Sequence, residues 1–251
     1  MELKEILQDR RSGAIEILKR AVNWLIEHPA ALHREKREET LECLATERTS
    51  MSAFVRLAER LQQDPSPDTL ERVRAELQMS DSAIARNLIE RIGCSASARV
   101  TTLSWSTTVL AAIRYATNCF SEIHVLESQP GGEGRRLADK LSHFHVHVRL
   151  HPDQELEEVA GQCDMGLIGA DTVFADGAVV NKVLSAALAE SLKKQGKPLY
   201  VLASRWKLND RRSADFRIDS RDGELFEVVP ADRIAGIVNE DGVIQPPLIG
   251  P

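Results

Sequence analysis

Aromatic and cysteine side chains are scarce in this sequence of 251 residues. Trp, Tyr and Phe together make up 4% of it, so we expect a core built mainly from Leu, Val, Ile and Ala. The four cysteines form neither a CxxC pair nor a Cys/His cluster, which argues against a zinc site and a disulfide framework. They are Cys43, Cys94, Cys119 and Cys163. This pattern favours a reducing cytoplasm.

Long apolar runs and an excess of positive charge are also missing. No run approaches the ~20 residues of a membrane span, and the opening MELKEILQDRR is too charged for a signal peptide. The formal net charge of −6 argues against general nucleic-acid binding. Neither a GxGxxG fingerprint nor a Walker loop occurs. We therefore expect a cytoplasmic protein with no cofactor, no membrane contact and no direct nucleic-acid binding.

The chain divides into two halves with different hydrophobic patterns. In residues 1–93, apolar positions recur at helical spacing, for example from Ile15 to Ile26. Asp68 and the pair Asp81–Ser82 are placed to cap two separate helices, and Gly93 is placed to end the second. At ~150 residues per domain the length suits one large domain or two small ones. The first half therefore predicts a helical N-terminal domain.

Short β-branched runs alternate with helical patterns in residues 94–251. Strands are predicted over residues 100–103, 123–126, 145–150, 165–169 and 199–202. Helices are predicted over residues 106–117, from 134 onward, 154–160 and 183–192. Such alternation predicts right-handed βαβ units and a parallel sheet, so the fold class is α/β. Parallel sheets bind ligands beyond the carboxyl ends of their strands, and candidate residues are sought there.

The segment from Ile168 to Lys182 is the most informative one. An apolar run that predicts a buried strand stops at Asp171, and a turn at Gly177 leads to Asn181 and Lys182. We expect this polar pair to open a helix that holds a phosphate at its N-terminus. Partial burial of Asp171 would raise its pKa toward neutrality and suit proton transfer. The alternative for Asp171 is an acid that caps a helix or forms a turn. The alternative for Asn181 and Lys182 is an N-cap followed by a solvated lysine.

Two further crossings from strand to helix carry candidate anion ligands. The loop from Glu127 to Arg136 is rich in glycines, which let backbone N–H groups approach an anion beside Arg135 or Arg136. A plain flexible loop is the equal alternative. The segment Ser104–Thr108 offers hydroxyls at a helix N-terminus, where an N-cap by Ser106 is the simpler interpretation.

A metal site is not predicted. His143, His145 and His147 alternate along an expected strand and would share one face. Without an added acid this spacing is poor support for a metal site. We expect instead that the histidines lie on a face of the strand that points to solvent or is covered by a helix.

The pattern GAD-x-x-x-x-DG-x-x-x-NK, from Gly169 to Lys182, resembles a known family. It is that of the regulatory alpha, beta and delta subunits of translation initiation factor 2B and their relatives, ribose-1,5-bisphosphate isomerase and methylthioribose-1-phosphate isomerase. Supporting matches are Glu127–Pro130 with Gly134–Arg135, Lys197–Val201, Phe226–Pro230 and Glu240–Ile244. The segment Arg11–Ala14 resembles the loop that touches substrate in the isomerases, although Ser12 alone would explain a helix start. The resemblance covers about residues 10 to 246.

This resemblance implies a helical N-terminal domain packed on a Rossmann-like C-terminal domain, which usually forms the dimer. It also implies a phosphosugar or nucleotide site between the domains. Asp171 matches the Asp of the isomerases' catalytic Asp–Cys pair. The residues that would bind the ligand are Arg11, Gly13, Ala14, Gln129, Arg135, Asn181 and Lys182.

Three departures from the family pattern bear on chemistry. Ser104 stands where the isomerases have the Cys, and a serine is a far poorer acid than a thiol. Gln129 replaces an Arg and so removes a bidentate phosphate partner. The family segment NKIGT reads NKVLS here. These changes point away from standard isomerase chemistry.

Three functions are therefore compared. The first is a regulatory-subunit-like homodimer that binds a phosphorylated sugar or nucleotide and lacks standard isomerase activity. The alternative is an aldose–ketose isomerase of a ribose-1-phosphate derivative such as ribose 1,5-bisphosphate, in which Asp171 shuttles a proton and Ser104 replaces the thiol. The third is a purely structural role among translation-factor subunits.

Overall fold

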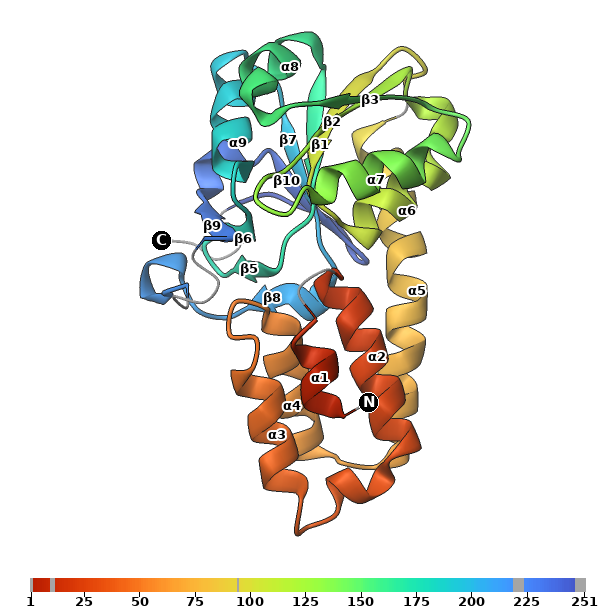
Figure 1. Ribbon diagram of the computed structural model, residues 1–251, viewed down its shortest axis with the longest axis vertical. Coiled ribbons are helices and arrows are strands. Elements are labelled where there is room, and N and C mark those ends of the chain that lie inside the picture. Colours follow the sequence, from red (N-terminus) through yellow and green to blue (C-terminus); the bar gives the residue numbers. More distant parts are fainter. Residues whose placement is uncertain (1, 10–11, 94, 219–223, 247–251) are drawn as a thin grey trace.

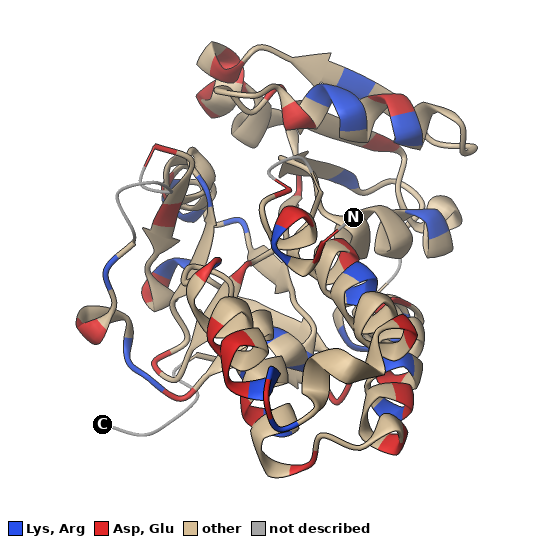
Figure 2. Ribbon diagram, turned by 60° about the horizontal axis from the view of Figure 1, so that its bottom comes forward, with Lys and Arg blue, Asp and Glu red and all other residues tan. Residues whose placement is uncertain are grey.

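One long helix joins a helical N-terminal part to an α/β C-terminal part (Figure 1). The computed structural model describes residues 2–9, 12–93, 95–218 and 224–246. The helices of the N-terminal part are α1 (Leu3–Leu7), α2 (Ala14–Glu27), α3 (Arg37–Thr46), α4 (Ser52–Gln63) and α5 (Pro67–Ile92). Their apolar faces enclose a core in which Leu18, Leu25 and Phe54 are fully buried. In Figure 2, acidic and basic residues are interspersed along these helices.

Helix α5 replaces the two helices that the sequence predicted in this region. It runs unbroken from Pro67 to Ile92 and ends at Gly93, which has a φ of 101°. Asp81 lies within this helix, and its carboxylate accepts hydrogen bonds from Lys19 of α2 and from Thr108 of α6 (Thr107–Tyr115). The prediction of a helix start at Asp81–Ser82 was therefore wrong. The acid at this position contacts neighbouring helices and does not cap a helix.

The start of α5 also differs from the prediction. Its N-cap is Ser66, whose Oγ accepts a hydrogen bond from the Thr69 N–H at 3.3 Å. Asp68, predicted as the cap, lies in the first turn. Pro67 occupies the first helical position, where a missing N–H costs nothing.

The C-terminal part is built on a seven-stranded sheet of order β11-β10-β7-β4-β1-β2-β3. All neighbouring pairs are parallel except β10 and β11. The strands are β1 (Arg99–Leu103), β2 (Glu122–Leu126), β3 (His147–His151), β4 (Met165–Ile168), β7 (Leu199–Leu202), β10 (Gly236–Asn239) and β11 (Gly242–Ile244). The order reverses between β1 and β4, which is the switch point of a Rossmann-like sheet. The predicted α/β class is confirmed.

Helices cover both faces of this sheet (Figure 1). They are α6 (Thr107–Tyr115), α7 (Glu133–Ser142), α8 (Leu156–Gln162) and α9 (Ser185–Lys194). One core contains residues of α6 and α7 together with Ile84 and Leu88 from the second half of α5. The other lies under α8 and α9. Helix α5 therefore packs on the N-terminal helices with its first half and on the sheet with its second half. It ends at Ile92, next to the domain boundary that was predicted after residue 93.

A second, smaller sheet contains the polar pair that was expected to open a helix. Its strand order is β8-β5-β6-β9, with β5 (Thr172–Phe174), β6 (Val179–Lys182), β8 (Leu208–Asn209) and β9 (Phe226–Val229). Asn181 and Lys182 lie in β6, and α9 begins only at Ser185. The predicted helix start at Asn181 was wrong because this segment pairs with β5 and β9 instead.

The three histidines do not alternate along one strand, because β3 begins only at His147. Among the described residues no group of three or more His, Cys, Asp or Glu side chains is arranged to hold a metal ion. No helix within the described ranges is long and apolar enough to cross a membrane. Cys119 is disulfide-bonded, whereas Cys43 and Cys163 are free. The sequence pattern did not predict that disulfide.

Candidate functional site

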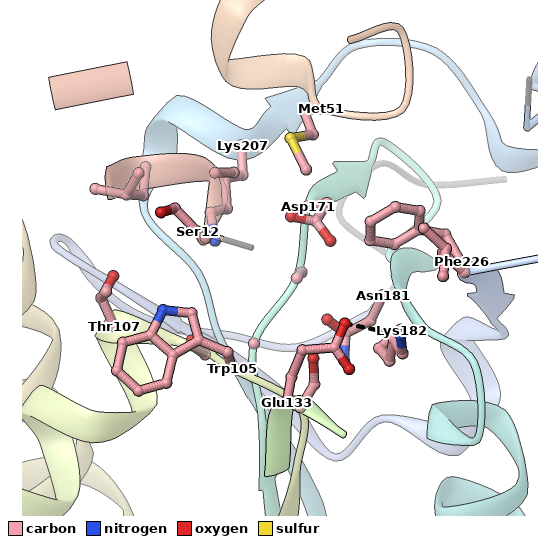
Figure 3. A pocket seen from close by; sticks show the side chains of 18 of the residues that line it. Ser12, Met51, Trp105, Thr107, Glu133, Asp171, Asn181, Lys182, Lys207 and Phe226 are labelled. Atoms are coloured by element: carbon pink, nitrogen blue, oxygen red, sulfur yellow. Dashed lines mark hydrogen bonds and ion pairs between the residues drawn. The ribbon is translucent and has the colours of Figure 1, made fainter. Parts of the chain in front are cut away.

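A cavity lies between the N-terminal helices and the carboxyl ends of β1 and β4 (Figure 3). Six of the nine predicted site residues line it: Gly13, Ala14, Ser104, Asp171, Asn181 and Lys182. Its other lining residues include Asp9, Ser12, Arg48, Met51, Trp105, Ser106, Thr107, Glu133, Lys207 and Phe226. The structure thus brings together residues that are far apart in the sequence, at the switch point where such sheets bind ligands.

The remaining predicted residues lie elsewhere. Arg11 falls outside the described residues. Gln129 and Arg135 are exposed and are not among the residues that line the cavity. The Arg135 guanidinium instead pairs with Glu127 at 2.6 Å. Their part in ligand binding stays a prediction.

Asp171 is held at the junction of the two parts of the chain. Its backbone N–H donates to Val180 O at 2.8 Å, which fixes the start of the small sheet. The next residue, Thr172, is fully buried, and its hydroxyl lies 2.7 Å from the Ser52 hydroxyl of α4. The same Thr172 hydroxyl donates to Ser50 O at 2.9 Å. These contacts between the two parts fix the backbone at Asp171, whose side chain lines the cavity.

Ser104 has a backbone conformation that is rare for a residue with a side chain. Its φ is 63°, and that of Ser128 is 66°. Each left-handed residue costs about 1–2 kcal/mol, so the surroundings must impose the geometry. The Ser104 N–H donates to Ser128 Oγ at 2.6 Å, and the two carboxylate oxygens of Asp153 accept the N–H groups of Ser128 and Gln129. Asp153 and Ser128 therefore position Ser104 at the exit of β1.

Lys182 is almost fully buried and joins the small sheet to the glycine-rich loop. Its Nζ donates to Pro130 O at 2.6 Å and pairs with Glu133 Oε1 at 2.9 Å. The other carboxylate oxygen, Glu133 Oε2, is buried and has no hydrogen-bond partner among the described residues. Because a buried acceptor is costly to leave unsatisfied, this oxygen is a ready acceptor for a ligand hydroxyl.

Two helix N-termini open on the cavity, and neither is that of α9. Helix α2 begins at Ala14 after Gly13, and no side chain caps it. Helix α6 begins at Thr107 after Ser106, whose Oγ accepts the Val109 N–H. Unpaired N–H groups and the helix dipole make such ends suited to phosphate. The first turn of α9 is instead occupied by Glu227, whose carboxylate accepts the Ala186 N–H at 2.8 Å.

Lys207 was not among the predicted site residues. It ends a short turn of 3-10 helix, Arg205–Lys207, after β7, and its side chain reaches the cavity (Figure 3). Only 5% of it is exposed, and its ammonium makes no hydrogen bond or ion pair with the residues that the structure describes. Burial lowers its pKa, and the negative charges of Asp171, Asp81 and Glu240 oppose that shift. Ligand residues were expected at the carboxyl ends of the predicted strands, and Lys207 follows the one predicted over residues 199–202, but no local pattern distinguished this lysine.

Comparison with known proteins places the chain in a family. Residues 4–236 match the model of the initiation factor 2 subunit family. The chain belongs to this family. A translation initiation factor eIF-2B subunit 2-like protein of Pyrococcus horikoshii is 31% identical over 160 residues, which are 59% of this chain and 58% of that protein. Ribose 1,5-bisphosphate isomerase of Haloferax volcanii is 32% identical over 136 residues, which are 53% of this chain and 42% of the isomerase. These matches span about half the length of the two relatives.

Solved structures agree with this family membership. The translation initiation factor eIF-2B of Pyrococcus horikoshii OT3 has a TM-score of 0.85 and is 25% identical, covering 98% of this chain and 96% of the other. The resemblance to factor 2B subunits and sugar-phosphate isomerases, which the motif from Gly169 to Lys182 indicated, is thereby confirmed. Relatives of both kinds match, so the choice between binding and catalysis has to come from the site itself.

Proposed function

We propose that this family member binds a phosphorylated sugar or nucleotide in the cavity and lacks standard aldose–ketose isomerase activity. The observation that carries the proposal is the Lys207 side chain, which is only 5% exposed and lines a cavity on which the N-termini of α2 and α6 also open. Withdrawing a cation from water is costly, and a phosphate would stabilise it and also accept hydrogen bonds from the helix N–H groups.

Two carboxylates in the cavity suit the hydroxyl groups of a sugar. Asp171 and Glu133 both line it, and Glu133 Oε2 has no partner in the part of the chain that the structure describes. Carboxylate oxygens accept hydrogen bonds from hydroxyls, whereas they repel a phosphate. Cationic and N–H groups beside acceptor oxygens therefore favour a ligand with both a phosphate and free hydroxyls.

The lack of standard isomerase activity rests on Ser104. The resemblance implies a thiol at this position in the isomerases, and a hydroxyl ionises far less readily than a thiol. Asp171 and Ser104 do line the same cavity, which keeps an aldose–ketose isomerase of ribose 1,5-bisphosphate as the second candidate. Ketose formation by the wild type that disappears in Asp171→Asn would support this second function.

A thermal-shift titration tests the binding function. Ligands would be ribose 1,5-bisphosphate, methylthioribose 1-phosphate, ribose 5-phosphate, AMP and GMP, because a ligand at ~100 times its Kd adds ~2.7 kcal/mol of stability. We expect at least one to raise the Tm of the wild type, and the shift to be lost in Asp171→Ala and Lys182→Ala. The exposed Asp232→Ala and Lys194→Ala are matched controls that should keep it. Equal shifts in all four variants would refute this location of the site.

As partners we propose a second copy of this chain, contacted through the C-terminal part, and translation-factor subunits. The support is family membership, since one chain of the same fold comes from a structure described as the tetrameric eIF2B-beta2-delta2 complex of C. thermophilum. Sedimentation of the purified chain would show whether it forms a homodimer. A monomer at all concentrations would exclude the homodimer.

A further inference from the structure

Glu240, in the turn between β10 and β11, joins three elements through one carboxylate. Its Oε1 accepts hydrogen bonds from Ser80 Oγ of α5 and from Ser204 Oγ after β7, each at 2.5 Å. Its Oε2 accepts the Arg205 N–H at 2.8 Å. Ser80 and Ser204 are both buried. Hydrogen bonds to an ionised acceptor are about twice as strong as neutral ones, so this carboxylate is a firm connection between α5 and the turn after β7.

That turn carries Lys207. Ser204 O accepts the Lys207 N–H at 2.8 Å, and Ser204 Oγ accepts the Trp206 N–H at 3.4 Å. Trp206 packs into the core of the N-terminal helices, and the Arg60 guanidinium lies over its ring at 5.2 Å from the centroid. The side chain of Lys207 reaches the ligand cavity. The backbone from which the Lys207 side chain extends is thus anchored through the three preceding residues.

The Glu240 carboxylate is itself held in place by its neighbours. Asn87 Nδ2 of α5 donates to Asn239 O at 2.8 Å and to Glu240 O at 3.0 Å. Asn239 Oδ1 in turn accepts the N–H groups of Asp241 and Gly242. The turn between β10 and β11 is therefore held by its own hydrogen bonds and by those to α5. This keeps Glu240 in a fixed position, from which it binds the turn that carries Lys207.

We propose that Glu240 is a positioning residue for the ligand site, which holds the Lys207 ammonium in the cavity by fixing its turn to α5. This inference rests on the proposed function, because it assumes that Lys207 contacts the phosphate of the ligand. Glu240 has a second effect through its charge. Its carboxylate opposes the lowering of the Lys207 pKa by burial, as do Asp171 after β4 and Asp81 on α5. Within the described ranges, the other charged groups that line the cavity are Asp9, Arg48, Glu133 and Lys182.

The test compares wild type, Glu240→Gln, Lys207→Met and the double variant by calorimetric titration with ribose 5-phosphate from neutral to alkaline pH. We expect Glu240→Gln to weaken binding about tenfold, which corresponds to ~1.4 kcal/mol, and to move the alkaline loss of binding to lower pH. In the Lys207→Met background the same change should have no further effect. The exposed Glu158→Gln is the matched control. The role of Glu240 would be overturned if Glu240→Gln changed neither the affinity nor the pH profile. It would also be overturned if Glu240→Gln weakened binding equally in the wild-type and Lys207→Met backgrounds.

Two additions keep this inference separate from the proposed function. Ser80→Ala removes one hydrogen bond to Glu240 and keeps its charge, so it should weaken binding without moving the pH profile, and it replaces Glu240→Gln if that variant does not fold. The pKa of Lys207 is measured without ligand by NMR of 15N-labelled lysine side chains. If wild type does not bind the probe, the proposed function fails, but a lower Lys207 pKa in Glu240→Gln still supports the connection. An unchanged pKa then refutes it.

Discussion

The Ser128 hydroxyl accepts a hydrogen bond from the Ser104 backbone N–H at 2.6 Å, and both residues have a positive φ. Ser128 is fully buried, and its Oγ also donates to Leu126 O at 3.0 Å. The Ser128 side chain, which follows β2, thus fixes the backbone conformation of Ser104, which follows β1. This contact is why a residue other than glycine adopts a left-handed conformation at the edge of the ligand cavity.

Ser128→Ala should destabilise the protein by about 1–3 kcal/mol, because it leaves the Ser104 N–H and Leu126 O without that partner. It should also weaken ligand binding, since Ser104 is released from its position. Urea unfolding measures the first effect and a thermal-shift titration the second. Ser142→Ala, whose exposed hydroxyl bonds only to Asp139 O, should change stability by less than ~0.5 kcal/mol. Similar losses in both variants would contradict the role of Ser128.

Lys207→Met should stabilise the protein while it weakens ligand binding. The gain at neutral pH should be about 1–3 kcal/mol, since a largely buried ammonium that makes no hydrogen bond with the described residues is replaced by an apolar chain of similar length. The pKa of Lys207 is lowered from 10.5, so between the folded pKa and 10.5 the unfolded chain binds more protons and wild-type stability rises with pH. The advantage of the variant should therefore shrink toward pH 10.5. Urea unfolding at several pH values checks this, and a destabilised variant at neutral pH would be the opposite result.

Gly134→Ala should prevent or severely impair folding. A Cβ at Gly134 would lie 1.8 Å from Leu126 O, where no side chain can move aside, because the neighbour is backbone at the end of β2. Gly161→Ala is the matched control in α8, where the nearest atom to a new Cβ lies at 3.6 Å, and it should stabilise by up to ~1 kcal/mol. Circular dichroism melting of both variants is the measurement. A Gly134→Ala protein as stable as wild type would show that the glycine loop is not packed on β2 as described.

Ser104→Cys should introduce aldose–ketose isomerisation of ribose 1,5-bisphosphate that the wild type lacks. A thiol with a pKa near ~8.5 can exchange a proton at neutral pH, whereas a serine hydroxyl cannot. Ketose formation by chromatography is the readout, and Ser104→Cys with Asp171→Asn is the control that should be inactive. Efficient turnover by the wild type would contradict the binding function and support the second candidate.

Much of the fold could be predicted from local sequence patterns, whereas the site depended on distant contacts. The alternation of strand and helix after residue 93 is a local signal, and it was sufficient for the α/β class. Asn181 and Lys182 were misplaced because their strand is determined by β9, which follows much later in the chain. Lys207 was missed because its burial follows from Trp206 packing among the N-terminal helices. In both cases residues distant in the sequence decide the environment.

The central claim is that a phosphate binds beside Lys207 and the N-termini of α2 and α6. A crystal structure of the protein with ribose 1,5-bisphosphate tests it most directly. We predict a phosphate within hydrogen-bond distance of the backbone N–H groups at the start of α2, with Lys207 Nζ as its cationic partner and sugar hydroxyls at Asp171 and Glu133. A phosphate held instead by the exposed Arg135, with the cavity left to solvent, would contradict it.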